Sequence, residues 1–244
     1  MTKHPILVVC GHASYFVPKY IRKDMLLSDR DIKNEADLYT DQIFKVKGAH
    51  FIESKVSRLV VDCNRAPDHI ELEYQLARDG VVVSVNEDCK QIYETPPTME
   101  QIMSRIEKYH DPFHNKIEAL KKDVKFLIDG HSLRSIGPAA KNDRGKERAD
   151  IVIGNRHFTS CTRTVTLKVI HFFQAKGLKV ALNEPFEGKY VLGHHCSRNS
   201  LYGLQIEVNR RLYMNEKNLR AHKRKIADLN ATMVELIEML DELL

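Results

Sequence analysis

The chain has 244 residues, 43% hydrophobic and 29% charged, with a net charge of +5. This composition is typical of a globular protein with a full core, and we expect residues 1–244 to form a single domain. No apolar stretch approaches the roughly 20 residues that span a bilayer. We therefore do not expect a membrane protein. Tryptophan is absent and aromatic residues make up 7% of the chain, so we do not expect a platform for stacking nucleic-acid bases either.

The first predicted element is a buried strand over residues 5–10 that runs into Gly11 and His12. The N-terminus leads directly into this strand without a secretory signal. The five cysteines are odd in number and not closely paired, which fits reduced thiols and a cytoplasmic protein. A helix is expected next, over residues 30–47, and it contains Glu35 and Asp37.

The remaining elements alternate between strands and helices. Strands are predicted at residues 50–54, 58–63, 81–85 (within the mixed segment 69–95), 124–129, 150–153, 178–183 and 203–208, and helices near 99–122, near 160–176 and from about 215 onward. Pro112 should interrupt or kink the first of these helices, and residues 184–200 are expected to form a loop. This alternation predicts an α/β fold with a largely parallel sheet.

Two histidines follow buried strands in the same way. His12 comes after the first strand, and His131 comes after the strand at 124–129, in the sequence Asp-Gly-His-Ser. Because ligands bind at strand ends in open α/β sheets, two imidazoles there favour a metal site. A catalytic zinc would need a carboxylate as third ligand, and Glu35 and Asp37 are the candidates. The alternative is that each histidine bonds to the backbone of its turn and that both acids are surface charges.

The predicted strand at 58–63 leads into an amide and a guanidinium, Asn64 and Arg65, with Arg58 at its other end. Arginine suits a carboxylate ligand because its planar fork binds both oxygens. The alternative is an arginine that pairs with Asp62 or Asp68 in a loop.

Glu207 lies in an otherwise apolar predicted strand, between Ile206 and Val208. If its face of the strand is buried, its pKa is raised, which suits a general base that acts on water. Simple alternation gives the other interpretation, in which Glu207 faces solvent.

The loop at 184–200 contains Tyr190, His194 and His195, which could touch a substrate if the loop is a mobile flap. Two more histidines, His110 and His114, flank the proline of the long helix. They are interpreted either as partners of the site or as ordinary helix residues.

Taken in order, six motifs resemble the N-formylglutamate amidohydrolase family, also called N-formylglutamate deformylases. They are Gly-His-Ala-Ser, Glu-Ala-Asp, Ser-Arg-Leu-Val-Val-Asp-Cys-Asn-Arg, Asp-Gly-His-Ser-Leu-Arg-Ser, Asn-Glu-Pro-Phe-Glu-Gly-Lys-Tyr and Leu-Gln-Ile-Glu-Val-Asn-Arg-Arg-Leu-Tyr-Met. The resemblance runs from about residue 5 to residue 216. It implies a mixed sheet flanked by helices, as in zinc carboxypeptidases and aspartoacylases. It also implies a metal-dependent enzyme that cleaves N-formyl-L-glutamate, or a similar N-acyl amino acid, into formate (or another short acid) and the free amino acid.

The resemblance also implies roles for single residues. His12 and His131 correspond to zinc ligands, with Asp37 favoured over Glu35 as the carboxylate ligand. Glu207 corresponds to the base that activates water. The residues that the resemblance implies in substrate binding are Asn64 and Arg65, which grip the α-carboxylate, and Arg58, Arg134 and Tyr190 as secondary contacts. We add His194, from the same loop as Tyr190, as a candidate substrate contact.

The chain departs from the family motifs around the expected substrate pocket. The first motif is Cys10-Gly11-His12-Ala13-Ser14, where the family has Pro-His-Ser-Gly, and a later glycine pair is replaced by Gly188-Lys189. We therefore expect the chemistry to be kept and leave the amino-acid side chain of the substrate open. The rival interpretations are an amidohydrolase or carboxypeptidase-like enzyme for a different N-acyl amino acid or peptide, and a non-catalytic binding module on the same fold.

Overall fold

The computed structural model describes residues 4–71, 79–197 and 199–244, so part of the predicted mixed segment 69–95 lies outside the described residues. The centre of the molecule is a sheet with the strand order β2-β1-β3-β6-β4-β5. The strands are β1 (Ile6–Cys10), β2 (His50–Glu53), β3 (Phe126–Leu133), β4 (Ile151–Gly154), β5 (Val180–Leu182) and β6 (Tyr202–Asn209). The first four in the order are mutually parallel, while β4 pairs antiparallel with β6 and parallel with β5. The predicted mixed, largely parallel α/β sheet is confirmed.

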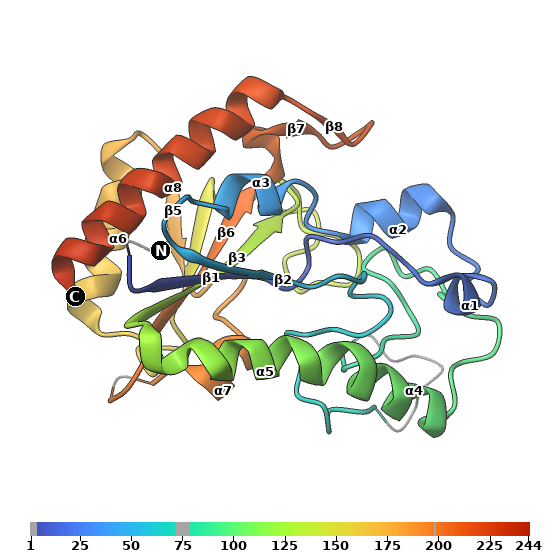
Figure 1. Ribbon diagram of the computed structural model, residues 1–244. Helices are drawn as coiled ribbons and strands as arrows, with labels where there is room; N and C mark the ends of the chain where they lie inside the picture. Colours follow the sequence, from blue (N-terminus) through green and yellow to red (C-terminus); the bar gives the residue numbers. More distant parts are fainter. Residues whose placement is uncertain (1–3, 72–78, 198) are drawn as a thin grey trace.

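Helices cover both faces of this sheet (Figure 1). The helices over the sheet are α3 (Thr40–Phe44), α5 (Asp111–Leu120), α6 (Arg163–Ala175), α7 (Tyr190–His195) and α8 (Lys223–Leu243), while α1 (Lys19–Arg22), α2 (Asp29–Glu35) and α4 (Met99–Arg105) lie to one side of it. Side chains alternate between the two faces of a strand. Ile128 of β3 therefore packs into a core with α3, α6 and α8, while Leu127 packs on the other side with α5 and α7. In the described part of the chain, no helix is long and apolar enough to cross a membrane.

The prediction of one helix over residues 30–47 is wrong, because the segment forms two helices, α2 and α3. Between them Ala36 is extended, and Tyr39 has a left-handed backbone with a φ of 69°. The backbone N–H of Asp37 donates to the carbonyl of His12 at 2.9 Å. The break therefore fixes Asp37 against the segment that follows β1.

The strands predicted at residues 58–63 and 81–85 are also wrong. Neither segment forms a strand: both consist of turns, bends and irregular backbone, apart from an isolated β-bridge between Val85 and Gln91. Most of their apolar side chains are buried in a cluster with α1 and α4. The backbone N–H of Asp62 donates to the carbonyl of Val81 at 2.7 Å, which joins the two segments. A short apolar run indicates burial, and burial does not distinguish a strand from a packed loop.

Three further elements differ from the predictions. The predicted long helix is not one α-helix: a π-helical turn (Ile106–His110) joins α4 to α5, so the α-helical pattern is interrupted just before Pro112, which lies in the first turn of α5. The last helix begins at Lys223 instead of near residue 215, since β7 (Met214–Asn215) and β8 (Arg220–Ala221) pair before it. The segment expected to be a loop at 184–200 contains the helix α7.

Candidate metal centre and active site

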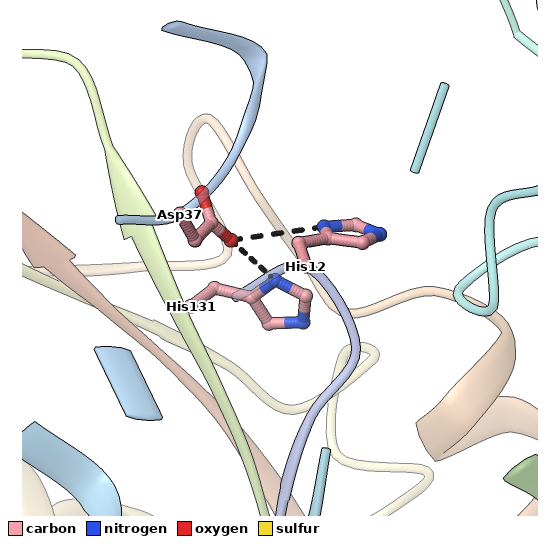
Figure 2. A group of neighbouring side chains, drawn as sticks. All are labelled: His12, Asp37 and His131. Atoms are coloured by element: carbon pink, nitrogen blue, oxygen red, sulfur yellow. Dashed lines mark hydrogen bonds and ion pairs between the residues drawn. The ribbon is translucent and has the colours of Figure 1, made fainter. Parts of the chain in front are cut away.

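His12, Asp37 and His131 converge at the carboxyl ends of the parallel neighbours β1 and β3 (Figure 2). His131 lies within β3, because this strand continues to Leu133 alongside β6 instead of ending at residue 129 as predicted. The Oδ2 atom of Asp37 is 3.0 Å from Nδ1 of His131 and 3.7 Å from Nδ1 of His12. All three side chains are buried. The three segments that carry them are far apart in the sequence.

Each of the two imidazoles is oriented by a carboxylate on its other ring nitrogen. Nε2 of His12 lies 2.6 Å from Oδ1 of Asp62. Nε2 of His131 lies 2.8 Å from Oδ1 of Asp129, which is two residues earlier on the same face of β3. Both Nδ1 atoms are left facing Asp37. Carboxylates placed in this way fix the tautomer and the ring orientation of metal-ligating histidines.

The carboxylate of Asp37 is fixed by hydrogen bonds to Oδ1, the oxygen that does not face the imidazoles. The hydroxyl of Ser132 donates to its Oδ1 atom at 3.1 Å, and the guanidinium of Arg210 reaches the same atom at 3.3 Å. Arg210 also donates to the backbone carbonyls of Asn34 and Ala36, both at 2.9 Å. These contacts leave Oδ2 of Asp37 turned toward the imidazoles.

The cluster contains fewer hydrogens than its contacts need. A neutral imidazole carries one N–H. When both rings are neutral and that hydrogen lies on Nε2, toward the carboxylate of Asp62 or Asp129, the two Nδ1 lone pairs face an oxygen of Asp37, an arrangement that is repulsive unless a metal ion or an additional proton lies among the three atoms. Two imidazoles and one carboxylate are a ligand set of catalytic zinc sites. The residues present therefore fit a divalent cation.

The contacts between the imidazoles and the carboxylates also determine the pKa values of His131 and Asp37. Burial opposes a charge on His131, but the carboxylates of Asp129 and Asp37 outweigh it and hold the pKa of His131 well above its usual value. Burial likewise opposes ionisation of Asp37, yet its bonds to His12 and His131 hold its pKa well below the usual range. The cluster thus stabilises positive charge beside Asp37.

Glu207 lies next to His131, because the parallel register of β3 and β6 pairs these two residues. Glu207 is 5% exposed, so the interpretation that it faces solvent is wrong. The side-chain amide of Gln205 donates to its Oε1 atom at 2.9 Å. Burial raises the pKa of Glu207 to about 8, with a contribution from the charges of Asp37 and Asp129 and an opposing one from His131. A carboxyl group that titrates near neutral pH is suited to general-base catalysis.

Glu35 belongs to a neighbouring ion cluster. Its carboxylate accepts hydrogen bonds from Arg134 at 2.9 Å and from the backbone N–H of Glu87 at 3.4 Å. Arg134 also pairs with Asp88 at 2.5 Å. Among the described residues, the ligand atoms that lie within 4.8 Å of one another include the carboxylate of Asp37 and not that of Glu35. Burial raises the pKa of Glu35.

The two arginines near residue 60 are both paired. Arg58 donates to Oδ2 of Asp62 at 2.7 Å, and the other oxygen of this carboxylate binds His12. One carboxylate thus separates Arg58 from the three-residue cluster. The guanidinium of Arg65 pairs with Asp79, whose side chain is 49% exposed. The structure therefore forms the Arg58–Asp62 pair that the sequence offered as the alternative.

Asn64 connects the cluster to α7. Its side-chain nitrogen lies 3.3 Å from Oδ2 of Asp129 and 3.3 Å from Nε2 of His131. Its side-chain oxygen accepts the backbone N–H of Val191 at 2.9 Å.

Two further predicted substrate contacts lie together in α7. The ring of Tyr190 stacks on that of His194, with ring centroids 4.9 Å apart.

Sequence reasoning missed the residues behind the ligands. These are Asp62 and Asp129, which orient the histidines, and Ser132 and Arg210, which hold Asp37. Asp129 could have been found from strand alternation, because it lies two residues before a candidate ligand. The sequence suggests Asp62 only as a partner of an arginine. Arg210 gives no signal, since its contact with Asp37 depends on the turn that follows β6.

Comparisons with known proteins give the family of the chain and support its fold. The family model described as N-formylglutamate amidohydrolase matches residues 4–214. The crystal structure of N-formylglutamate amidohydrolase from Ralstonia eutropha JMP134 is similar over 100% of this chain and 96% of that chain, with 21% identity and a TM-score of 0.83. A gene product from Agrobacterium tumefaciens is similar over 98% of this chain and 90% of that chain, with 18% identity and a TM-score of 0.74. A search of curated proteins finds no match. At these identities the two solved structures support the fold.

Proposed function

Because the chain belongs to the N-formylglutamate amidohydrolase family, whose members hydrolyse amide bonds, we propose that it hydrolyses N-formyl-L-glutamate with the help of a bound zinc ion. The products are formate and the free amino acid. The observation that carries the proposal is the convergence of His12, Asp37 and His131 with both imidazole Nδ1 atoms facing one carboxylate oxygen. The small-molecule substrate, the metal and the roles below are parts of this proposal.

The ion would be held by the Nδ1 atoms of His12 and His131 and by Oδ2 of Asp37. A divalent cation bound there polarises the amide carbonyl and makes water more acidic. Asp62 and Asp129 keep each imidazole in the tautomer with its lone pair on Nδ1.

Glu207 is the proposed general base. It takes a proton from the attacking water and delivers it to the nitrogen of the leaving amino acid. Its burial beside His131 supports this role, because the register of β3 and β6 places the carboxyl group next to a proposed metal ligand. The bond from Gln205 fixes one oxygen of Glu207 and leaves the other for the water.

Binding of the substrate is assigned to the residues that surround the cluster. Arg65 and Asn64 grip the α-carboxylate, and Arg65 exchanges its exposed partner Asp79 for the substrate. Fixing this end of the substrate places the amide carbon for attack, which converts binding energy into orientation. Arg58, Arg134 and Tyr190 are secondary contacts in this proposal. Arg58 pairs with Asp62 behind His12, Arg134 binds Glu35 in the neighbouring ion cluster, and Tyr190 lies beside the ring of His110.

Formate release by the purified protein tests the proposal. We expect formate from N-formyl-L-glutamate, loss of the activity after exhaustive chelation, and its recovery with zinc. A panel of N-formyl and N-acetyl amino acids and dipeptides tests the alternative of a different N-acyl substrate, which would give higher kcat/KM on another member of the panel. A zinc-loaded protein that is inactive on the whole panel would contradict hydrolysis, and activity that survives chelation would contradict the role of the metal.

A further inference from the structure

A second group of metal-binding side chains lies where α5 meets α7. It consists of Glu118 in α5 and of His194 and His195 in α7, whose ligand atoms lie within 4.8 Å of one another. Oε1 of Glu118 is 2.8 Å from Nδ1 of His195 and 3.9 Å from Nε2 of His194. The side chain of His195 is fully buried, while those of His194 and Glu118 are 46% and 45% exposed. The group is therefore anchored in the protein and open to solvent on one side.

A chain of contacts runs inward from this group. Nε2 of His195 is 2.7 Å from Nδ1 of His114, and Nε2 of His114 is 2.9 Å from the carbonyl oxygen of Cys63. Together with the contact between His195 and Glu118, this makes three contacts in a row, and each needs one hydrogen. Two neutral imidazoles carry two. His114 and His195 are 7% and 2% exposed, and such burial disfavours an additional proton on either ring.

The missing hydrogen concerns His195. His114 donates from Nε2 to the carbonyl of Cys63, because a carbonyl only accepts. A neutral His195 then has one hydrogen for two contacts, with Nδ1 of His114 at 2.7 Å and with the carboxylate of Glu118 at 2.8 Å. A cation beside Nδ1 of His195 removes this deficit, because the ring can then donate its hydrogen to His114.

We propose that Glu118, His194 and His195 form a second, peripheral binding site for a divalent cation of the zinc, nickel or copper type, which fills this deficit and joins α5 to α7. Two imidazoles and one carboxylate suit these ions, whereas magnesium and calcium prefer oxygen ligands. A tetrahedral ion with bonds of about 2.0–2.1 Å holds its ligand atoms about 3.3 Å apart. The observed separations of 2.8 and 3.9 Å lie on either side of that value. The site shares no residue with the His12, Asp37 and His131 cluster.

Lys121 is the cation that now competes for this carboxylate. Its Nζ atom lies 2.7 Å from Oε1 of Glu118, and its side chain is 29% exposed, so it can turn into solvent when a metal binds. Removal of the lysine should therefore strengthen metal binding. The exposed Lys116, in the same helix, provides a matched control for the loss of one positive charge.

The two helices that the ion would join also form hydrogen bonds to Asn64 and to the preceding residue, Cys63. The backbone N–H of Val191, in α7, donates to the side-chain oxygen of Asn64 at 2.9 Å. His114, in α5, donates to the carbonyl of Cys63. The peripheral ion would therefore restrain from both sides the segment that carries Asn64 to the candidate active site.

Zinc titration of the metal-free protein by isothermal calorimetry tests the site. We expect two equivalents for the unaltered chain. His194→Ala and Glu118→Gln should each weaken one equivalent at least about 10-fold, since each removes a ligand. Asp37→Asn should weaken the other equivalent. Lys121→Ala should bind the peripheral equivalent about two- to fivefold more tightly, the change expected for an exposed ion pair, and Lys116→Ala should leave both unchanged.

The outcomes separate this site from the proposed active site. Two unchanged equivalents in folded His194→Ala and Glu118→Gln proteins would overturn the peripheral site, as would a single equivalent in the unaltered chain that is lost in Asp37→Asn. A single equivalent that is lost in His194→Ala and kept in Asp37→Asn would support the peripheral site and contradict the metal at the active site. An unchanged affinity in Lys121→Ala would contradict the assignment of Glu118 as a ligand.

Discussion

At the scale of single residues, the single N–H of each imidazole decides what the candidate metal centre can bind. His12 and His131 each direct that hydrogen to a carboxylate behind the ring, Asp62 in one case and Asp129 in the other. The lone pairs that remain face the carboxylate of Asp37, which Arg210 and Ser132 hold in place. The residues behind the ligands therefore determine whether the site attracts a metal ion.

Asp129→Asn tests this orienting role. The carboxylate accepts from both His131 and the side-chain amide of Asn64, and an asparagine at this position has one acceptor oxygen to serve the two donors. We expect the zinc affinity of the cluster to fall about 10–100-fold, as measured by competition with a chelator. The exposed Asp123, next to β3, supplies the control Asp123→Asn, for which no change is expected. Equal affinities of the two variants would contradict the role of Asp129.

Glu207→Gln tests the proposed general base. The substitution keeps the size of the side chain and its contact with Gln205 but removes the group that takes a proton. We expect kcat for formate release to fall by a factor of about 10² to 10⁴ while zinc stays bound. Glu238→Gln, an exposed change in α8, should leave kcat unchanged. Turnover within a few-fold of the unaltered protein would remove Glu207 from this role.

The sequence could indicate these residues because each has a local signature. Gly-His at two strand ends singles out His12 and His131, and the isolated acid in an apolar strand singles out Glu207. The structure brings all three to one edge of the sheet. The sequence could not indicate the orienting role of Asp62. The segment that carries Asp62 folds as turns, and its contact with His12 joins residues that are 50 positions apart.

At the scale of elements, the interruption between α2 and α3 places one candidate ligand. Asp37 lies in this break, and α3 then turns over the sheet so that Phe44 covers Gly130. Gly130 precedes His131, so the backbone of β3 next to the candidate ligand is in close contact with α3. The helical pattern of residues 30–47 could not reveal this, because Ile32 of α2 and Ile43 and Phe44 of α3 recur at helical spacing although they pack into two different clusters.

Gly130→Ala tests this close packing. A Cβ atom at residue 130 would lie 2.8 Å from the ring of the buried Phe44, so the ring or β3 must shift. We expect the free energy of unfolding to fall by about 1–3 kcal/mol, measured by chemical denaturation. Gly11→Ala is the matched control, since the added atom would lie 3.8 Å from its nearest neighbours and should change stability by less than about 0.5 kcal/mol. Equal stability of the two variants would contradict the account of this contact.

At the scale of the whole molecule, the pattern of apolar runs was enough to predict the class of fold. Strands that are buried on both faces need helices on both sides, and the sheet is largely parallel as a result. The same pattern gave strands at 58–63 and 81–85 where the chain forms packed turns. The direction of β4 and β5 could not be predicted either, because it depends on the path of the connections between strands.

Acid stability of the molecule should depend on the pair between Asp143 and Arg148. The guanidinium of Arg148 is 3% exposed and donates twice to this carboxylate, at 2.6 and 2.9 Å. The bonds from Arg148 lower the pKa of Asp143 in the folded state. Between that value and the unfolded value of about 3.9, the unfolded chain binds more protons, so the stabilisation is present above about pH 4 and is lost as the pH falls.

We therefore expect Asp143→Asn to lower the free energy of unfolding by about 2 kcal/mol at pH 7 and by much less at pH 3. Chemical denaturation at both pH values measures the difference. Asp29→Asn removes an exposed carboxylate that also pairs with an arginine, and it should have little effect at either pH. A loss for Asp143→Asn that is the same at pH 3 and pH 7 would contradict the ion pair as its cause.

An anomalous difference map, measured at the zinc absorption edge on crystals of the protein grown with zinc, tests the proposed metal centre. We expect a peak at about 2.0–2.2 Å from Nδ1 of His12, Nδ1 of His131 and Oδ2 of Asp37. A map without a peak among these atoms, with Asp37 still in direct contact with a protonated His131, would contradict the account.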